Sequence, residues 1–397
     1  ALDEPNDLLS SDDDAPIIKL LNSIFFDAIR KKASDIHIET YETALLIRFR
    51  LDGVLQTVLH SKPQVAPLLI SRVKILANLD IAEKRKPQDG RISVKLGGRL
   101  VDLRVSTLPA AYGERVVLRV LDKESSKLEL SSLGMPDAIR ARLEKVITSP
   151  NGIILVTGPT GSGKTTTLYA VLAKLDRQSF NIMTVEDPIE YYFTGISQTQ
   201  VNTKADMTFA GGLRAILRQD PDIVLIGEIR DKETLHISAQ ASLTGHLVLS
   251  TLHTNTAVGA ITRLYNLGLE PFLISSTVQA VMAQRLVRRL CIDCKEECLA
   301  DENELDIMNL AQDSKMKIYK SVGCTNCNHS GFKGRVGLYE LIIMDAKAKH
   351  MISERVSEIE LAQHCAQENP SIFQCGLDRV KEGLTTLSEV LRVTQES

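Results

Sequence analysis

The sequence predicts an α/β protein in which a smaller domain of mixed helices and strands precedes a larger domain built on a parallel β-sheet. From Ile139 onward, short apolar runs alternate with helical patterns, as they do in a parallel sheet with crossover helices. A glycine-rich loop separates one of these apolar runs from the helical pattern that follows it. Two hairpin signals lie earlier, within residues 15–124. The length of 397 residues exceeds what one core usually serves, which favours two or three domains.

The composition is that of an ordinary globular protein, with 44% hydrophobic and 24% charged residues. No stretch approaches the roughly 18 to 20 apolar residues of a membrane span, and the start lacks the basic-then-apolar pattern of a secretory signal. We therefore expect a cytoplasmic protein without a membrane span of its own. The chain begins with Ala1 rather than Met, from which we expect a fragment or a processed form.

Charge is distributed unevenly along the chain. Residues 1–14 contain six acids and no base, and we expect them to form a solvated acidic linker. Residues 15–124 contain 19 Lys and Arg against 12 Asp and Glu, so this basic domain suits a nucleotide, a nucleic acid or an acidic protein. Aromatic residues make up only 4% of the chain and Trp is absent, which leaves few stacking platforms for nucleic acid. We expect no nucleic-acid partner.

The basic domain has the pattern of an α+β fold. Apolar residues recur at helical spacing from Ile17 to Ile29, just after Pro16. The turn sequences Leu51-Asp52-Gly53 and Gly97-Gly98 lie between strand-like runs, which predicts two hairpins. The expected strands are residues 44–50, 54–59, 91–96, 100–105 and 114–121, and a polar linker is expected over residues 123–133.

The second domain, expected over residues 134–290, is predicted to form the parallel sheet. Its buried strands are predicted over residues 152–157, 181–185, 222–226 and 246–251. A cysteine-containing element over residues 291–327 then interrupts the alternation. The C-terminal region, residues 328–397, is expected to be helical, with its helices around residues 344–393.

Residues 158–165 have the pattern of a phosphate-binding loop between a strand and a helix. Three glycines let backbone N–H groups turn toward phosphate oxygens, and the helix N-terminus adds partial positive charge. We expect Lys164 to reach the β- and γ-phosphates of ATP and Thr165 to hold Mg²⁺ through its hydroxyl. The expected ATP-binding residues are Gly158, Pro159, Thr160, Gly161, Ser162, Gly163, Lys164 and Thr165.

Acidic residues at strand ends supply the group that hydrolysis needs beyond the phosphate loop. The apolar strand over residues 222–226 leads to Glu228, which we expect to polarise water or to steady Mg²⁺. Glu186 ends another expected strand and is a second candidate for activating water. The carboxyl ends of parallel strands are where α/β proteins bind ligands, so both acids suit that edge of the sheet.

Two histidines, His246 and His253, bracket one expected strand. They are seven positions apart, so strand alternation turns them to opposite faces. We expect one of them to hydrogen-bond a γ-phosphate and the other to brace a neighbouring loop. An ordinary structural histidine is the alternative for each.

Four of the seven cysteines form two Cys-x-x-Cys pairs, Cys291 with Cys294 and Cys324 with Cys327. Two such pairs supply four thiolates, which suits a structural tetrahedral Zn²⁺ with no open position for catalysis. A redox motif, the alternative, needs only one pair. The other cysteines, which lack the spacing of this site, are Cys298, Cys365 and Cys375.

Together these motifs resemble those of the secretion ATPases of the type II/type IV pilus superfamily. Residues 33–39 and 48–54 are similar to the N-terminal signature of that family, and residues 184–190 to its Asp box. Residues 217–231 are similar to its extended Walker B segment, and residues 244–255 to its His box. The resemblance covers nearly everything after the acidic linker.

Within the superfamily, residues 387–394 are similar to the ending of the type II secretion ATPases, the E subunits. The resemblance implies a PAS-like N-terminal domain, a RecA-like ATPase domain and a homo-hexamer at the cytoplasmic face of the inner membrane. It implies two inner-membrane partners, a bitopic docking subunit and a polytopic platform subunit, and ATP-driven pseudopilus assembly for protein export. Family members carry a further N-terminal domain, which we expect to be missing before Ala1. Many type II and pilus-assembly members carry a tetracysteine element, which pilus retraction ATPases generally lack.

The resemblance also assigns a role to two arginines of the basic domain, Arg104 and Arg119. Both match family arginines that approach the triphosphate when the N-terminal domain closes on the ATPase domain. An arginine supplied in this way would stabilise charge on the phosphates. Strand-face arginines in surface ion pairs are the alternative.

Three other functions share the phosphate loop. A type IV pilus extension ATPase would use the same chemistry in another machine. A RecA-like DNA motor would bind nucleic acid with a steep salt dependence. A nucleotide-gated scaffold would bind ATP without hydrolysing it, and substitution of Glu228 distinguishes it from an ATPase.

Overall fold

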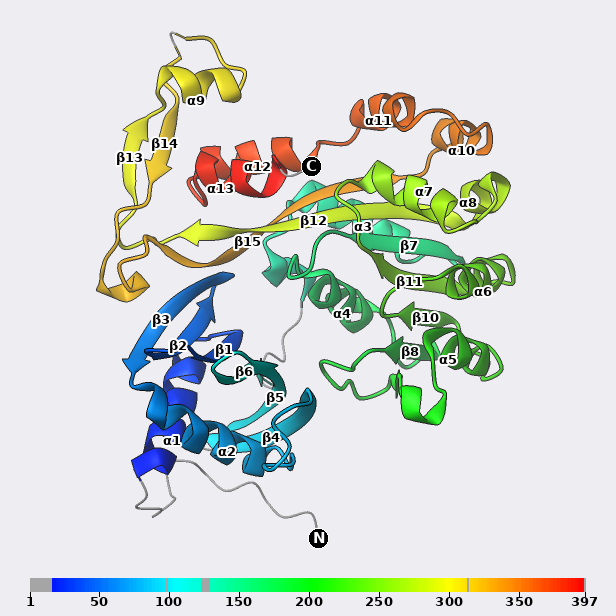
Figure 1. Ribbon diagram of the computed structural model, residues 1–397. Coiled ribbons are helices and arrows are strands. Elements are labelled where there is room, and N and C mark those ends of the chain that lie inside the picture. The colour runs from blue at the N-terminus through cyan, green and yellow to red at the C-terminus, as the bar shows by residue number, and fades with distance from the viewer. Residues whose placement is uncertain (1–15, 97–98, 123–128, 313, 396–397) are drawn as a thin grey trace. The chain divides into compact units, whose positions relative to one another are not determined.

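The computed structural model describes residues 16–96, 99–122, 129–312 and 314–395 (Figure 1). The chain divides into two compact units, Ala1–Ser126 and Lys127–Ser397. The expected acidic linker, the Gly97-Gly98 turn and residues 123–128 of the expected polar linker lie outside the described residues. Within the described ranges, no helix has both the length and the apolar character that crossing a membrane requires.

The N-terminal unit contains a six-stranded antiparallel sheet. Its two α-helices are α1 (Pro16–Arg30) and α2 (Ala66–Leu76). The expected helix and hairpins are confirmed, but α2 was not predicted, because its apolar residues continue almost without a polar face. In sheet order the strands are β3 (Val54–Ser61), β2 (Leu45–Leu51), β1 (Asp35–Thr40), β6 (Gly113–Asp122), β5 (Arg99–Ala110) and β4 (Gln88–Leu96).

The two faces of this sheet differ in polarity because side chains alternate along each strand. Ile36 and Ile38 of β1 belong to the core that α1 and α2 complete. Asp35, His37 and Glu39 alternate with them and are also buried. The sheet therefore has an apolar face that packs under the two helices. Its other face is polar, and the charged side chains there bury one another.

The C-terminal unit contains a seven-stranded sheet in the order β15-β12-β7-β11-β10-β8-β9. Neighbouring strands are parallel except β15, which is antiparallel to β12. The four predicted strands are present with boundary shifts of at most one residue. The strands are β7 (Gly152–Thr157), β8 (Ile182–Glu186), β9 (Ser197–Gln200), β10 (Ile223–Ile226), β11 (Leu247–Leu252), β12 (Val278–Leu290) and β15 (Phe332–Ile343).

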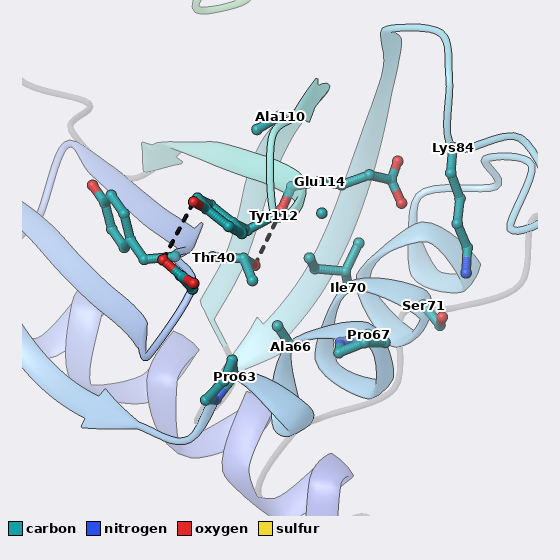
Figure 2. Close-up of a pocket in the computed structure, with 13 residues that line it drawn as sticks. Thr40, Pro63, Ala66, Pro67, Ile70, Ser71, Lys84, Ala110, Tyr112 and Glu114 are labelled. Atoms are coloured by element: carbon teal, nitrogen blue, oxygen red, sulfur yellow. Dashed lines mark hydrogen bonds between the residues drawn. The ribbon is translucent and has the colours of Figure 1, made fainter.

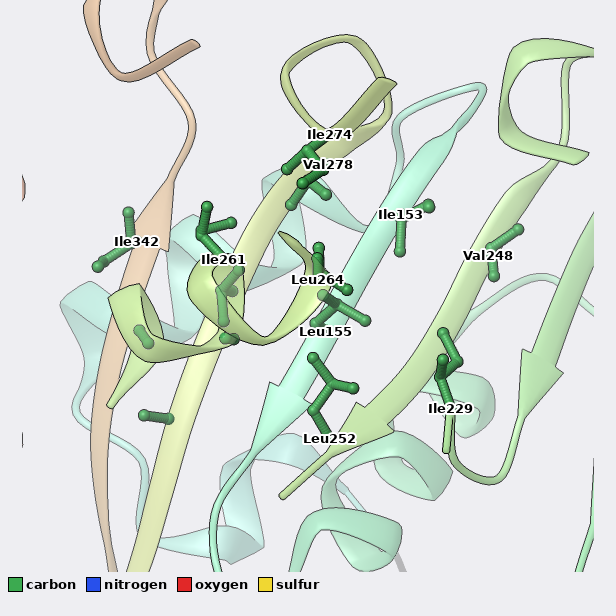
Figure 3. Packing of buried hydrophobic residues seen from close by; sticks show 14 of the residues in the cluster. Ile153, Leu155, Ile229, Val248, Leu252, Ile261, Leu264, Ile274, Val278 and Ile342 are labelled. Atoms are coloured by element: carbon green, nitrogen blue, oxygen red, sulfur yellow. The ribbon is translucent and has the colours of Figure 1, made fainter. Parts of the chain in front are cut away.

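Helices pack on both faces of this sheet and form a core on each. One core includes α3 (Asp137–Val146) and α4 (Lys164–Lys174). The other core includes α5 (Phe209–Ile216), α6 (Lys232–Leu243), α7 (Ala257–Asn266) and α8 (Pro271–Thr277). Figure 3 shows Leu264 of α7 against Leu155 of β7 in this second core. Because both faces are covered, β7, β10 and β11 are buried along their whole lengths.

The C-terminal region is not helical throughout, as residues 328–397 were expected to be. It begins with β15, which extends the main sheet beside β12. The run from Val336 to Leu341 is almost continuously apolar, and such a short run does not distinguish a buried strand from a helix. The helices then follow, as expected for residues 344–393: α10 (Ala346–Ser353), α11 (Glu358–Ala366), α12 (Ile372–Lys381) and α13 (Leu387–Thr394).

The last helix, α13, is attached to β12 through the buried carboxylate of Glu389. This carboxylate accepts hydrogen bonds from Arg288 N at 3.0 Å, Arg288 Nη2 at 2.7 Å and Arg392 Nη2 at 2.9 Å. Burial alone would raise the pKa of Glu389, but the hydrogen bonds from Arg392 and Arg288 outweigh it and lower the pKa to about 2. The ionised form of Glu389 therefore stabilises the fold.

Replacing Glu389 by Gln is expected to lower the free energy of unfolding at pH 7 by about 3 kcal/mol. A carboxyl pKa that is lower in the folded state contributes stability above the ordinary value of about 4.5, and this contribution is lost as the pH falls toward 2. Urea unfolding at pH 7 and pH 3 should show the deficit shrinking at the lower pH. The exposed Glu354, changed to Gln, is the control. An equal deficit at both pH values would contradict this account.

Candidate functional site

The predicted phosphate loop leaves the carboxyl end of β7 and leads into α4. Gly158, Gly161 and Gly163 all have positive φ, at 147°, 80° and 87°. A Cβ at Gly158 would lie 2.4 Å from the backbone oxygen of Gln284, and one at Gly163 would lie 2.8 Å from Gln284 Nε2. All three glycines therefore meet a conformational requirement, and Gly158 also meets a steric one, because the start of the loop packs directly on β12.

Two polar side chains of this loop fit a phosphate ligand. Lys164 Nζ donates to the backbone oxygens of Gly158 at 2.7 Å and Pro159 at 3.1 Å, within the loop itself. Burial lowers the pKa of Lys164 to about 8, with Glu228 opposing the change and Arg285 adding to it. The buried Ser162 Oγ makes no hydrogen bond to any described residue. A bound anion would satisfy this hydroxyl and the charge of the lysine together.

Glu228 and His253 lie at the same edge of the sheet as the phosphate loop. They follow β10 and β11, and β11 lies between β10 and β7. His253 Nε2 lies 3.5 Å from Glu228 Oε2, and Arg230 also pairs with this carboxylate. The hydroxyl of Thr251 donates to the backbone oxygen of Gly227 at 2.7 Å, which holds the start of the Glu228 turn. His253, which is half-exposed, and the carboxylate of Glu228, which is 14% exposed, thus lie beside the phosphate loop.

The charge environment of His253 favours the neutral imidazole. Burial lowers its pKa first, and the nearby Lys164 ammonium lowers it further. Glu228 acts in the opposite direction but does not outweigh them. At neutral pH this ring therefore offers one donor and one acceptor beside the phosphate loop.

His246 lies at the opposite end of β11. The parallel register pairs Leu247 with Gly152 and Leu252 with Thr157, so His246 stands near the start of β7 rather than its end. A six-residue strand separates the two histidines by about 20 Å. His246 Nδ1 lies 2.8 Å from the backbone oxygen of Ala241, so it braces the turn before β11. The structure does not bring His246 to the phosphate loop of its own chain.

Glu186, the second acid predicted to activate water, is buried in the protein interior. Its side chain accepts hydrogen bonds from the hydroxyls of Tyr169 and Thr184 and from Gln198 Nε2. The residue is 3% exposed. Tyr169 belongs to α4, and burial followed by the charge of Glu186 raises the pKa of its hydroxyl. In the structure, Glu186 therefore joins β8 to the helix that follows the phosphate loop.

The predicted arginines of the N-terminal unit lie in one row across its polar face. Arg104 of β5 pairs in register with Arg119 of β6 and with Arg91 of β4. The row continues through Asp35 of β1 to Arg50 of β2. Arg119 Nε donates to Asp35 Oδ1 at 3.1 Å, and its side chain is 57% exposed. Within this unit, Arg119 therefore forms an ion pair with Asp35 on the face of the sheet. Such a pair was the alternative to the predicted contact with the phosphates.

The N-terminal unit also has a partly open pocket with a volume of about 280 Å³ (Figure 2). It lies between α2 and the turns that follow β1 and β5, with Thr40, Ile70 and Tyr112 among its lining residues. None of the predicted nucleotide-binding residues contributes to it. This pocket is therefore lined by other residues than those predicted to bind the nucleotide.

The four predicted metal ligands come together at the far end of β12. All four Sγ atoms lie within 4.8 Å of one another. The separations are 3.9 Å for Cys291 and Cys324, 3.8 Å for Cys294 and Cys327, and 3.8 Å for Cys324 and Cys327. Tetrahedral Zn²⁺ with bonds of about 2.3 Å requires sulfur atoms about 3.8 Å apart. The cluster therefore fits zinc in size, ligand type and number.

Backbone N–H groups point at the sulfur atoms of this cluster, which favours the thiolate form that binds a metal. N–H groups of Gly323, Cys324 and Gly331 donate to cysteine sulfurs at 3.2–3.3 Å. Such second-layer donors commonly orient metal ligands. Between the two pairs the chain forms an excursion, whose elements are β13 (Glu296–Leu299), α9 (Glu302–Ile307) and β14 (Lys317–Lys320). Cys298 lies on β13, outside the cluster.

The protein family described as "Type II/IV secretion system protein" matches residues 10–392, which is nearly the whole chain. The chain belongs to this family. A type II secretion system protein E from Pseudomonas aeruginosa is 57% identical over 393 residues, covering 99% of this chain and 78% of the relative. The type II secretion system ATPase E of Vibrio cholerae is 57% identical over 396 residues, covering 100% and 79%.

A solved structure of the pilus retraction motor PilT with bound ADP has a TM-score of 0.64 and 27% identity to this member of the type II/IV secretion family. The match covers 94% of this chain and 96% of the PilT chain. The two domain folds that the sequence resemblance implies, an antiparallel-sheet N-terminal domain and a RecA-like ATPase domain, are thereby confirmed. The four-cysteine cluster and the C-terminal helices complete the predicted fold class.

Several residues that support the phosphate loop were not predicted from the sequence. Gln284 contacts both the phosphate loop and α4, and Thr157 ties β7 to Thr254 through their hydroxyls, 2.7 Å apart. Arg285 contacts the loop after β11. The available signal was a pair of polar residues, Gln284 and Arg285, inside an otherwise apolar stretch of β12. The partners of these two residues depend on the order of strands in the sheet, and local sequence patterns do not reveal that order.

Proposed function

We propose that this chain is an ATP hydrolase that drives pseudopilus assembly and protein export in a type II secretion system. The observation that carries the proposal is the meeting of Lys164, Glu228 and His253 at one edge of the parallel sheet. The 57% identity to two type II secretion E proteins over nearly the whole chain supports type II secretion over pilus extension.

In the proposed site, backbone N–H groups of the loop, the Ser162 hydroxyl and Lys164 bind the β- and γ-phosphates of ATP. Thr165, whose side chain is exposed, provides the hydroxyl ligand for Mg²⁺. Bound Mg²⁺ supplies charge neutralisation at the phosphates. The buried Ser162 hydroxyl and the close approach of the β12 backbone to Gly158 support this assignment.

Glu228 is proposed to orient the attacking water and to take up its proton at a carboxylate oxygen. Neutral His253 holds this carboxylate from one side and Arg230 holds it from the other. Glu186 acts indirectly in this proposal, because its bond to Tyr169 sets the position of α4. From the resemblance, Arg104 and Arg119 are proposed to stabilise charge on the phosphates. His246 is proposed to brace the turn before β11 through its contact with the backbone oxygen of Ala241.

We further propose that the chain acts as a homo-hexamer at the cytoplasmic face of the inner membrane. The bitopic docking subunit and the polytopic platform subunit implied by the family resemblance are its proposed partners. The four-cysteine cluster is proposed to hold one Zn²⁺ with a structural role, because its sulfur separations match the tetrahedral requirement.

The test is ATP turnover by the chain alone and by the chain fused to a hexameric scaffold. We expect kcat per chain to rise on assembly, because a ring-coupled site is completed by neighbouring subunits. The control is a fusion that carries Lys164→Ala, which removes the phosphate-binding ammonium. Turnover that is absent from both forms, or equal with and without Lys164, would contradict the proposal.

A further inference from the structure

Two consecutive residues of β12 stand opposite the start of the phosphate loop. β7 ends at Thr157, which pairs in parallel register with Ala283, so β12 continues beside Gly158. The next two residues, Gln284 and Arg285, are 2% and 5% exposed. Buried polar side chains are almost always hydrogen-bonded, so their partners show what they hold in place.

These two side chains project to opposite faces of the sheet, as strand alternation requires. On one face, Gln284 Oε1 accepts a hydrogen bond from the Thr167 hydroxyl of α4 at 2.8 Å. On the other face, Arg285 Nη2 donates to the backbone oxygen of Asn255 at 2.8 Å and lies 3.3 Å from its side-chain oxygen. The first contact secures the helix after the phosphate loop, and the second secures the loop that carries His253.

Arg285 also lies beside the start of the phosphate loop and contacts the C-terminal helix. Its Nη1 donates to the backbone oxygen of Gln284 at 3.2 Å and would lie 3.3 Å from a Cβ at Gly158. Its Nε donates to the backbone oxygen of Val393 in α13 at 3.3 Å. The planar fork of a guanidinium can make such contacts in several directions at once, which an ammonium group cannot.

We propose that Arg285 is a positioning residue for ATP hydrolysis, which holds the His253 loop beside the phosphate loop and ties it to β12 and α13. This inference rests on the proposed function. Asn255 lies only two residues after His253, whose Nε2 is 3.5 Å from Glu228. If the Arg285 contacts are lost, the loop is free to move His253 away from Glu228. A displacement of about 1 Å near a reacting centre can cost about 100-fold in rate.

The first test compares Arg285→Gln and Arg285→Lys with Arg289→Gln, which changes an exposed arginine of the same strand. Both Arg285 variants are expected to lower kcat by about 10- to 100-fold, with KM for ATP within about threefold of wild type. The Arg289 variant should match wild type. Wild-type kcat in Arg285→Gln would overturn the proposal. Full activity in Arg285→Lys would also overturn it, because charge alone would then suffice.

The second test follows amide hydrogen exchange and does not depend on turnover. In Arg285→Gln, exchange is expected to rise about tenfold at residues 253–256 and 391–395 together, which corresponds to the loss of about one hydrogen bond. Arg288→Gln, which loosens the Glu389 contact, should raise exchange in α13 but not at residues 253–256. Wild-type exchange at residues 253–256 in Arg285→Gln would overturn the proposal.

The two tests separate failure of this inference from failure of the proposed function. If the wild type does not hydrolyse ATP in any assembly, the proposed function is wrong, and the exchange result still decides the role of Arg285. If the wild type hydrolyses ATP and the Arg285 variants match it, only the inference is wrong. Arg285→Lys keeps the buried charge and provides a folded variant if Arg285→Gln does not fold.

Discussion

Replacing Glu228 by Gln is expected to lower kcat for ATP hydrolysis by about 100- to 10,000-fold, the range for loss of a general base. The amide keeps the size of the side chain and one oxygen for Arg230, but it does not take up a proton from water. ATP affinity is expected to stay within about threefold, because the phosphate-binding groups belong to the loop and α4. Phosphate release and equilibrium binding of a fluorescent ATP analogue measure the two effects separately.

The matched control for this variant is Glu233→Gln. Glu233 is an exposed glutamate at the start of α6 that pairs with Arg214. Turnover by this control should equal that of the wild type. If Glu228→Gln also keeps wild-type turnover, Glu228 is not the base, and a site that binds ATP without hydrolysing it becomes the better explanation.

Loss of the four-cysteine site is expected to have the largest effect on stability. Apparent binding free energies of structural zinc are about 10–16 kcal/mol in small zinc domains, so removing one ligand should cost a large part of the local stability. Cys291 directly follows β12, and Cys327 lies just before β15. Cys327→Ser should therefore lose about one equivalent of zinc and expose residues 291–331 to proteolysis.

Cys298→Ser is the control for the zinc prediction, because Cys298 lies on β13 outside the cluster. It should retain the zinc content and protease resistance of the wild type. The prediction fails if wild-type protein purified without chelator contains no zinc and gains no protection when zinc is added. It also fails if Cys327→Ser binds as much zinc as the control.

Elements with strong local patterns were predicted well. The apolar run from Ile153 to Val156, followed directly by the glycine loop, correctly predicted a buried strand that leads into a helix. The hairpin signal Leu51-Asp52-Gly53 between two strand-like runs was also correct, because β2 and β3 pair on either side of it. The elements that were not predicted include α2, β1, β12 and β15. The apolar residues of α2, β12 and β15 show neither a clear helical face nor strict alternation.

The sequence by itself determined the chemistry: the phosphate loop, the acid after an apolar strand, and the two cysteine pairs. It did so because these functions require fixed residue types at fixed spacing. Only the tertiary structure decided which groups meet. It placed His253 beside Glu228 and His246 about a strand length away, because parallel strands align their ends. It turned Glu186 inward to Tyr169 and put Arg285 between three segments distant in sequence, since strand order is set by packing of the whole sheet.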